Sequence, residues 1–285
     1  MSSGPTSTPG DTVSLAISPC PNDTFAFHSL VHGLVPSAPR MDTTYADVDV
    51  TNLAAERGAY QIVKVSYGAL PWLLDKYTLL PCGGALGRGC GPLVLSAGEP
   101  DPERAVAGAT VAIPSERSTA YLLFRLWSQG FAPGRIVTLP FHEIMPAVRD
   151  GKVDAGLVIH EARFTYQQHG LHAVADLGDW WEADTGLPIP LGAILARRDL
   201  DAAAVADWVR QSVRAAWADP AATQGYVRAH AQEMDLAVTQ QHIELYVNQH
   251  TEDLGEDGRL AVATLLDRAS GAGLTPSVPA EVLGI

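Results

Sequence analysis

The stretch TVSLAISPCPNDTFAFHSLVHG, residues 12–33, contains the pattern that decides the fold. Val13–Ile17 is a short apolar run typical of a buried strand, and a polar, proline-containing loop leads from it into a helical pattern. We expect Asn22 or Asp23 to cap that helix and Gly33 to end it. A strand, a polar loop and a helix in this order form the building unit of an α/β protein.

The same unit recurs along the chain. Short apolar runs predict further strands at Gln61–Val65, Leu93–Leu95, Thr110–Ile113, Ile136–Leu139 and Ala155–Ile159. Past residue 191 the pattern becomes mainly helical, with an apolar stripe from Val205 to Trp217 and two further helices around residues 237–250 and 257–270. Strands that alternate with helices predict an α/β fold with mainly parallel sheets.

A length of 285 residues suits two lobes, since domains usually contain roughly 100–200 residues. The glycine-rich stretch GGALGRGCGP (83–92) lacks the GK[ST] ending of a phosphate loop, so a hinge or crossover is the better interpretation. We place the chain crossings near residues 96–99 and 189–193. The larger lobe would combine residues 1–97 and 192–285, and the smaller lobe would be residues 98–191.

The charge balance excludes several classes of partner. The net charge is −13 and no basic cluster is present, so we expect neither nucleic acid nor a membrane as a partner. No segment approaches the ~18 apolar residues that a membrane-spanning helix needs. Residues 1–11 contain no Lys, no Arg and no apolar run, so they predict a loose tail and not a secretory signal. Together these features predict a cytoplasmic protein.

The cysteines and histidines do not form a metal-binding pattern. Cys20, Cys82 and Cys90 are three in number and widely spaced, which fits neither a disulfide framework nor a zinc site. Cys20 stands between two prolines without a base nearby in sequence, so we interpret it as structural. We therefore expect no metal.

Polar side chains follow several of the apolar runs, at the strand ends where α/β sheets bind ligands. Lys64 and Ser66 end one run, and Lys64 would be partly desolvated there, which is unfavourable unless it meets an anion. Ser118 and Thr119 open a helix, where capping alone would explain one of the two hydroxyls. His160 follows a buried strand, which fits either a structural histidine or a catalytic one.

Several long motifs resemble those of one enzyme family. They are SPCPNDTFAFHSLVHG (18–33), KVSYGAL (64–70), GGALGRGCGPL (83–93), STAYLL (118–123), IHEARFTY (159–166) and LPIPLGAILARRDL (187–200). In this order they closely resemble the 1,4-dihydroxy-6-naphthoate synthases of the futalosine route to menaquinone. The resemblance implies a fold like the type II periplasmic binding proteins, in which two α/β lobes enclose a ligand cleft.

The resemblance also implies an activity and a site. The substrate would be cyclic dehypoxanthine futalosine, a carboxylated bicyclic compound joined to a sugar remnant, and the lyase would release 1,4-dihydroxy-6-naphthoate. It would need no metal and no organic cofactor. His160 corresponds to the general base of the family. The residues that correspond to substrate contacts are Lys64, Val65, Ser66, Ser118 and Thr119.

Two other functions share the expected architecture. One is a non-catalytic solute-binding protein, which would usually be secreted or lipid-anchored. The other is the chorismate dehydratase of the same pathway, although the IHEARFTY histidine favours the naphthoate synthase. The expected partner is in each case a small molecule, for the enzyme an anionic one. The sequence leaves the oligomeric state unknown.

Overall fold

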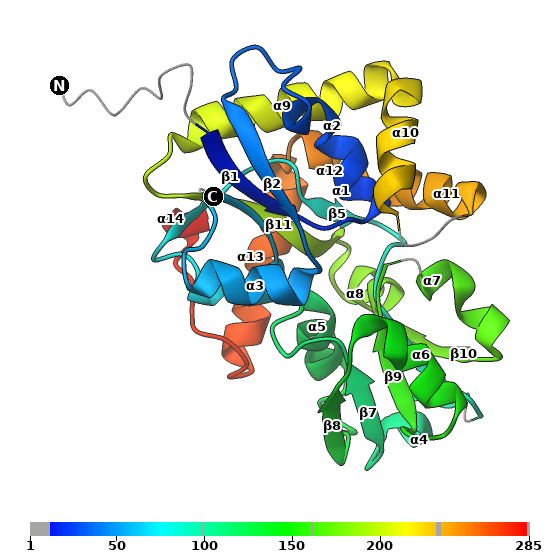
Figure 1. The fold of residues 1–285 in the computed structure, drawn as a ribbon. Helices are drawn as coiled ribbons and strands as arrows, with labels where there is room; N and C mark the ends of the chain where they lie inside the picture. The colour runs from blue at the N-terminus through cyan, green and yellow to red at the C-terminus, as the bar shows by residue number, and fades with distance from the viewer. Residues whose placement is uncertain (1–11, 99, 161, 232–234, 284–285) are drawn as a thin grey trace.

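Two β-sheets organise the chain, and Figure 1 shows them in two lobes of the ribbon. The computed structural model describes residues 12–98, 100–160, 162–231 and 235–283. The tail predicted for residues 1–11, and Glu161 of the IHEARFTY motif, lie outside the described residues. Within these described ranges, no helix is both long and apolar enough to cross a membrane. The two-lobed α/β fold that the sequence predicts is confirmed.

The first sheet has the strand order β2-β1-β3-β11-β4, and β5 pairs with β11 off this path. Its strands are β1 (Thr12–Ile17), β2 (Arg40–Tyr45), β3 (Ile62–Ser66), β4 (Tyr77–Leu79), β5 (Ala85–Gly87) and β11 (Ile189–Arg197). β1 pairs in parallel with β2 and β3, whereas β11 runs antiparallel to β3, β4 and β5.

Helices cover both faces of the first sheet. One face packs against α1 (Pro21–Ala26), α2 (His28–Val31), α9 (Ala202–Ala218), α10 (Pro220–His230) and α11 (Leu236–Tyr246). The other face packs against α3 (Val48–Glu56), the 3₁₀ helix η1 (Tyr67–Trp72), α13 (Gly255–Gly271) and α14 (Ala280–Leu283), while α12 (Gln249–Glu252) contacts α9 and β5. The predicted stripe on α9 is buried from Val205 to Ala216, and Trp217 at its end is exposed.

The second sheet has the strand order β10-β6-β9-β7-β8. Its strands are β6 (Leu93–Ser96), β7 (Thr110–Ile113), β8 (Arg135–Thr138), β9 (Ala155–Val158) and β10 (His172–Asp176). One face packs against α6 (Phe141–Arg149), α7 (Ala162–Thr165) and the 3₁₀ helix η2 (Tyr166–His169). The other packs against α4 (Pro102–Val106), α5 (Thr119–Trp127) and α8 (Leu177–Thr185).

The chain crosses between the sheets twice. It leaves the first sheet after β5 and enters the second at β6, and it returns through α8 into β11. The predicted boundary after residue 97 would leave β6 in the larger lobe, whereas β6 pairs with β9 and β10 of the second sheet. The first crossing therefore lies at the end of the glycine-rich stretch. The division into a lobe of residues 1–97 and 192–285 and a lobe of residues 98–191 stays a prediction.

Both sheets are mixed, so the prediction of mainly parallel sheets is wrong. β7 pairs in parallel with β8 and β9, but β6 runs antiparallel to β9 and β10. The chain enters the second sheet through β6 and returns to the first sheet through β11, and these two strands run antiparallel to their neighbours. β11 itself, nine residues long, falls where the sequence pattern predicts mainly helix.

The first helix also differs from its prediction. Cys20, and not Asn22 or Asp23, occupies the N-cap position of α1, and its side chain makes no capping hydrogen bond. Asn22 and Asp23 lie inside the helix, where both are buried. The predicted single helix is also split at Phe27 into α1 and α2, while Gly33 has the left-handed φ of 67° expected after a helix end.

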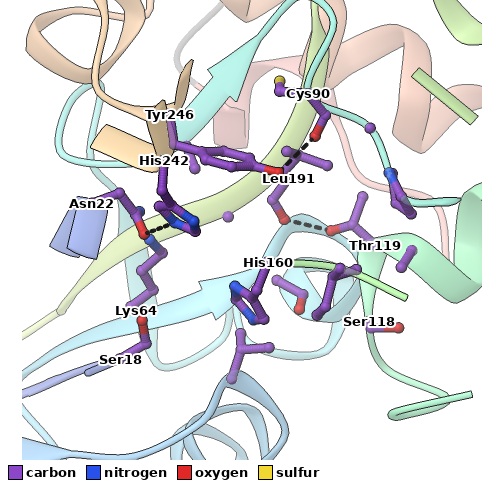
Figure 2. A pocket seen from close by; sticks show the side chains of 18 residues that line it. Ser18, Asn22, Lys64, Cys90, Ser118, Thr119, His160, Leu191, His242 and Tyr246 are labelled. Carbon is purple, nitrogen blue, oxygen red and sulfur yellow. Dashed lines mark hydrogen bonds between the residues drawn. The ribbon is translucent and has the colours of Figure 1, made fainter. Parts of the chain in front are cut away.

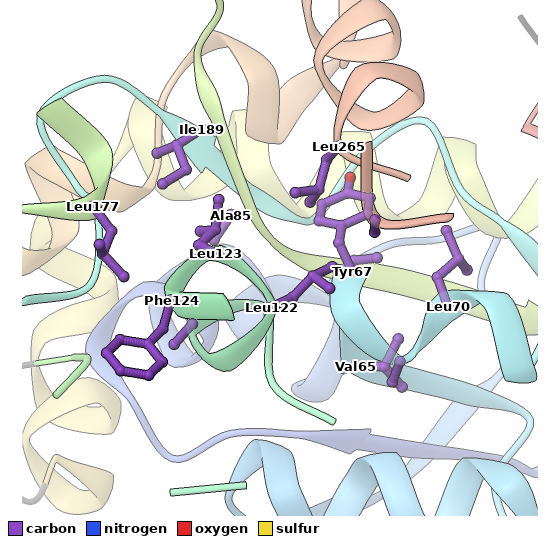
Figure 3. Close-up of a cluster of buried hydrophobic side chains, with 14 of the residues drawn as sticks. Val65, Tyr67, Leu70, Ala85, Leu122, Leu123, Phe124, Leu177, Ile189 and Leu265 are labelled. Carbon is purple, nitrogen blue, oxygen red and sulfur yellow. The ribbon is translucent and has the colours of Figure 1, made fainter. Parts of the chain in front are cut away.

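One hydrophobic cluster joins the two lobes. It contains Val65 and Tyr67 of the first lobe together with Val111 and Leu157 of the second. Figure 3 shows Leu122, Leu123 and Phe124 of α5 in this cluster, which also contains Tyr67 and Leu265 of the first lobe. Helix α5 therefore packs against the first lobe as well as against its own sheet, which fixes the position of its first residues.

We predict that Gly91→Ala destabilises the fold at the first crossing. A Cβ at Gly91 would lie 2.1 Å from the backbone N of Gly178 and 2.4 Å from its Cα, so the backbone must shift. Overpacking of this kind costs about 1–3 kcal/mol. The measurement is the free energy of unfolding in a denaturant titration.

Gly98→Ala is the matched control. Gly98 is exposed, and a Cβ there would meet nothing within 4 Å. We expect a change within about 0.5 kcal/mol for this variant. Equal stability of the Gly91→Ala and wild-type proteins would show that the crossing tolerates a side chain.

Candidate active site

A cavity lies between the lobes, and both lobes contribute to its wall. Figure 2 shows its labelled side chains, which come from segments far apart in sequence. Its polar lining consists of Ser18, Asn22, Lys64, Ser66, Ser118, Thr119, His160, His242 and Tyr246. Five of the six residues predicted for the site thus line one cavity. The exception is Val65, whose fully buried side chain belongs to the hydrophobic cluster of Figure 3.

Lys64 is buried beside Asp23. Lys64 lies in β3 and is only 7% exposed. Its ammonium group forms an ion pair with the Asp23 carboxylate. Asp23 is 1% exposed, and its Oδ2 also accepts a hydrogen bond of 3.1 Å from the backbone N–H of Ser18. The sequence predicts that a partly desolvated Lys64 meets an anion, with an anionic substrate as the expected one. In the structure a carboxylate of the protein already balances the charge of Lys64.

Hydrogen bonds extend from this ion pair to a buried histidine. The Asn22 amide nitrogen donates to Asp23 Oδ1 at 2.8 Å, and Asn22 Oδ1 lies 3.0 Å from Nε2 of His242 on α11. Burial, with the nearby His160 and Lys64, holds the pKa of His242 well below the usual value of 6.5. This histidine is therefore neutral at neutral pH.

The hydroxyls at the start of α5 are both engaged within the protein. Ser118 is the N-cap residue, and its Oγ accepts from Tyr121 N–H at 3.1 Å and donates to the Ser115 carbonyl at 2.8 Å. Thr119 Oγ1 donates to the Leu191 carbonyl at 2.6 Å and accepts from Gly68 N–H at 3.0 Å. The capping role expected for one hydroxyl is confirmed for Ser118, and Thr119 connects α5 to the first sheet.

His160 follows β9 and has an unusual backbone conformation. Its φ is 56°, in the left-handed region that non-glycine residues seldom adopt, although histidine does so more often than most. The ring packs edge-on against Phe141 at a centroid distance of 5.4 Å. Its Nδ1 lies 3.5 Å from Sγ of Cys20, in the other lobe. Cys20 is thus next to the candidate base in space, which its sequence position does not indicate.

The remaining reactive groups at the cavity offer little alternative chemistry. Burial raises the pKa of the Cys90 thiol to about 12, so it stays protonated and is a poor nucleophile. In the part of the chain that the structure describes, no three His, Cys, Asp or Glu side chains are grouped in a way that could hold a metal ion.

The fold and the cavity define a class of protein with two α/β lobes around a cavity, and solved structures support this fold. The ligand-binding component of an ABC-type import system from Staphylococcus aureus has a TM-score of 0.68 and 12% identity over 96% of this chain and 98% of its own. The alkanesulfonate-binding protein of Xanthomonas axonopodis has a TM-score of 0.70 and 14% identity over 95% and 96%. The chain therefore has a fold like the periplasmic binding proteins.

Sequence comparison is more specific. A family model described as menaquinone biosynthesis matches residues 13–271. Proteins named 1,4-dihydroxy-6-naphtoate synthase are 63% identical in Streptomyces coelicolor, over 96% of this chain and 98% of the relative, and 47% identical in Thermus thermophilus, over 93% and 96%. A crystal structure of a protein from Archaeoglobus fulgidus has a TM-score of 0.86 and 32% identity over 92% of this chain and 98% of its own. The chain belongs to the menaquinone biosynthesis family, among the 1,4-dihydroxy-6-naphthoate synthases.

The sequence analysis missed His242 and Tyr246, which line the cavity, and the contact of Cys20 with His160. His242 lies on a helix of the last third of the chain, where nothing in the local pattern distinguishes it from a surface histidine. Cys20 is 140 positions from its partner His160, so no spacing rule connects them. Only the two chain crossings, which bring α11, β1 and β9 together, reveal these contacts.

We predict that Lys64→Met strongly destabilises the protein. Removal of one partner of a buried ion pair leaves an uncompensated charge, which costs about 3–5 kcal/mol. The double variant Lys64→Met with Asp23→Asn should recover much of this loss, because no buried charge then remains unpaired. Free energies of unfolding of the two single variants, the double variant and the wild type complete the cycle. Additive losses would show that the two side chains do not depend on each other.

Proposed function

We propose that this chain converts cyclic dehypoxanthine futalosine to 1,4-dihydroxy-6-naphthoate, as a carbon–carbon lyase of the futalosine route. The observation that carries the proposal is the convergence of Lys64, Ser66, Ser118, Thr119 and His160 on one cavity. Those residues come from three of the motifs that resemble the family, and relatives with the synthase name match the chain over almost its whole length. The proposed location is the cytoplasm, and three buried cysteines that form no disulfide fit a reducing compartment.

His160 acts as the general base in this proposal. Cleavage of a carbon–carbon bond with aromatisation mainly requires the removal of protons, and imidazole is the most frequent general base in enzymes. A base at Nε2 needs the ring proton on Nδ1, and the sulfur of Cys20 lies within reach to accept that proton's hydrogen bond. The reaction would use the protein's own side chains, without a metal or an organic cofactor.

The substrate carboxylate binds at the start of α5. The first N–H groups of a helix have no acceptor within it, and the helix dipole favours an anion there. Ser118 and Thr119 hold this helix start in place through their hydroxyls, and Ala120 behind them also lines the cavity. Lys64 and Ser66 approach the ligand from the opposite lobe as hydrogen-bond donors. Val65, buried in the core, could contact it only through its backbone.

One assay separates this proposal from its rivals. Purified protein is incubated with cyclic dehypoxanthine futalosine, and formation of dihydroxynaphthoate is followed by its absorbance. A solute-binding protein would bind the compound and leave it unchanged. A chorismate dehydratase would instead consume chorismate and give no naphthoate.

We predict that His160→Asn loses about 10²–10⁴-fold in kcat, which is the usual contribution of a positioned general base. Affinity for the product should stay close to wild type, because asparagine keeps a polar group in the cavity. Steady-state kinetics and calorimetry measure the two quantities. His142→Asn is the matched control, since the His142 side chain is 78% exposed, and we expect it to retain full activity. A folded His160→Asn protein with normal turnover would refute the assignment of the base.

A further inference from the structure

One nitrogen in the cavity wall has no hydrogen-bond partner among the described residues. His242 is 1% exposed and its ring lines the cavity, yet its Nδ1 makes no hydrogen bond to any residue that the structure describes. A buried polar atom without a hydrogen bond costs about 1–3 kcal/mol, so its presence in a binding cavity needs an explanation.

The neighbouring contacts decide which role this nitrogen has. The Asp23 carboxylate can only accept hydrogen bonds, so Asn22 must turn its NH₂ group toward Asp23. Asn22 then presents its oxygen to His242, and Nε2 of His242 must carry the proton that it donates. Because the low pKa keeps the ring neutral, Nδ1 has a free lone pair. His242 is therefore a hydrogen-bond acceptor in the cavity.

We propose that Nδ1 of His242 accepts a hydrogen bond from a ring hydroxyl of the ligand and so sets the orientation of the ligand in the cavity. This inference rests on the proposed function. The product carries its carboxylate on one ring and its two hydroxyls on the other, so its two ends differ in chemistry. A hydroxyl can donate to Nδ1, whereas a carboxylate cannot.

The two sides of the cavity match these two ends. Figure 2 shows His160 between the Asn22–His242 pair on one side and Ser118 and Thr119 on the other. A carboxylate near His242 would face the lone pair of Nδ1, and the charge of the nearby Lys64 is already balanced by Asp23. At the start of α5 it would meet backbone N–H donors. The hydroxylated ring thus lies toward His242, the carboxylate toward α5, and His160 faces the region between them.

Two variants separate the two nitrogens of His242. A glutamine amide reaches the position of Nε2, so His242→Gln keeps the contact with Asn22 and removes the acceptor at Nδ1. An asparagine amide reaches the position of Nδ1, so His242→Asn keeps an acceptor there and loses the contact with Asn22. Two ligands complete the design: 1,4-dihydroxy-6-naphthoate, kept reduced under anaerobic conditions, and 2-naphthoate, which has the carboxylate but no hydroxyl.

The readout is the ratio of the two dissociation constants, measured by calorimetry for each protein. We expect His242→Gln to weaken binding of the dihydroxynaphthoate about 2- to 12-fold, the value of one hydrogen bond between uncharged groups, and to leave 2-naphthoate unchanged. His242→Asn should keep the preference of the wild type for the hydroxylated ligand. An unchanged ratio in His242→Gln would overturn the inference.

A measurement on the wild type covers the case in which a variant does not fold. In protein labelled with ¹⁵N-histidine, the Nδ1 resonance of His242 should move upfield with the dihydroxynaphthoate and stay in place with 2-naphthoate. The same shift with both ligands, or with neither, would contradict the role of Nδ1. Failure of the wild type to form the naphthoate would count against the proposed function. Normal turnover by the wild type, together with an unchanged ratio of dissociation constants in His242→Gln, would count against the role of His242 alone.

Discussion

A buried lysine is the constraint on which the rest of the site depends. An ammonium away from water costs several kcal/mol unless a carboxylate and hydrogen bonds meet it. Asp23 supplies the carboxylate, which also accepts hydrogen bonds from the N–H of Ser18 and the side-chain amide of Asn22. The orientation thereby imposed on Asn22 fixes the tautomer of His242. The need to balance the charge of Lys64 therefore makes Nδ1 of His242, on α11, a hydrogen-bond acceptor in the cavity wall.

The two chain crossings give this arrangement its geometry. β11 returns from the second lobe directly beside β3, with Gly192 opposite Ser66. A Cβ at Gly192 would lie 2.9 Å from Cε of Lys64, so the absence of a side chain there leaves room for the lysine. The carbonyl of Leu191 next to it accepts the hydrogen bond of Thr119. The same strand thus makes space for the buried charge and anchors the helix proposed to receive the substrate carboxylate.

Local patterns predict those features that local physics controls. The strands around Val13–Ile17 and Thr110–Ile113, the stripe on α9 and the capping role of Ser118 all depend on residues near in sequence. The mixed sheets, the strand β11 and the contacts of Cys20 and His242 depend on how the chain crosses between lobes. The burial of Lys64 was predictable from the apolar run around it, whereas its partner Asp23 looked like a helix cap. No pattern of spacing distinguishes a carboxylate that caps a helix from one that neutralises a lysine 41 positions away.

The backbone conformation at His160 is an independent argument for the role proposed for this residue. At His160 the backbone φ of 56° adds about 1–3 kcal/mol of conformational strain, because the residue has a Cβ. Glycine would avoid most of that strain. The chain nevertheless has an imidazole there, in an edge-on contact with Phe141 and with Cys20 beside its Nδ1. A histidine needed only for packing would gain nothing from this conformation. A base that must leave the end of a buried strand and turn its free nitrogen toward a ligand does gain from it, because the left-handed turn changes the direction of the chain at that residue.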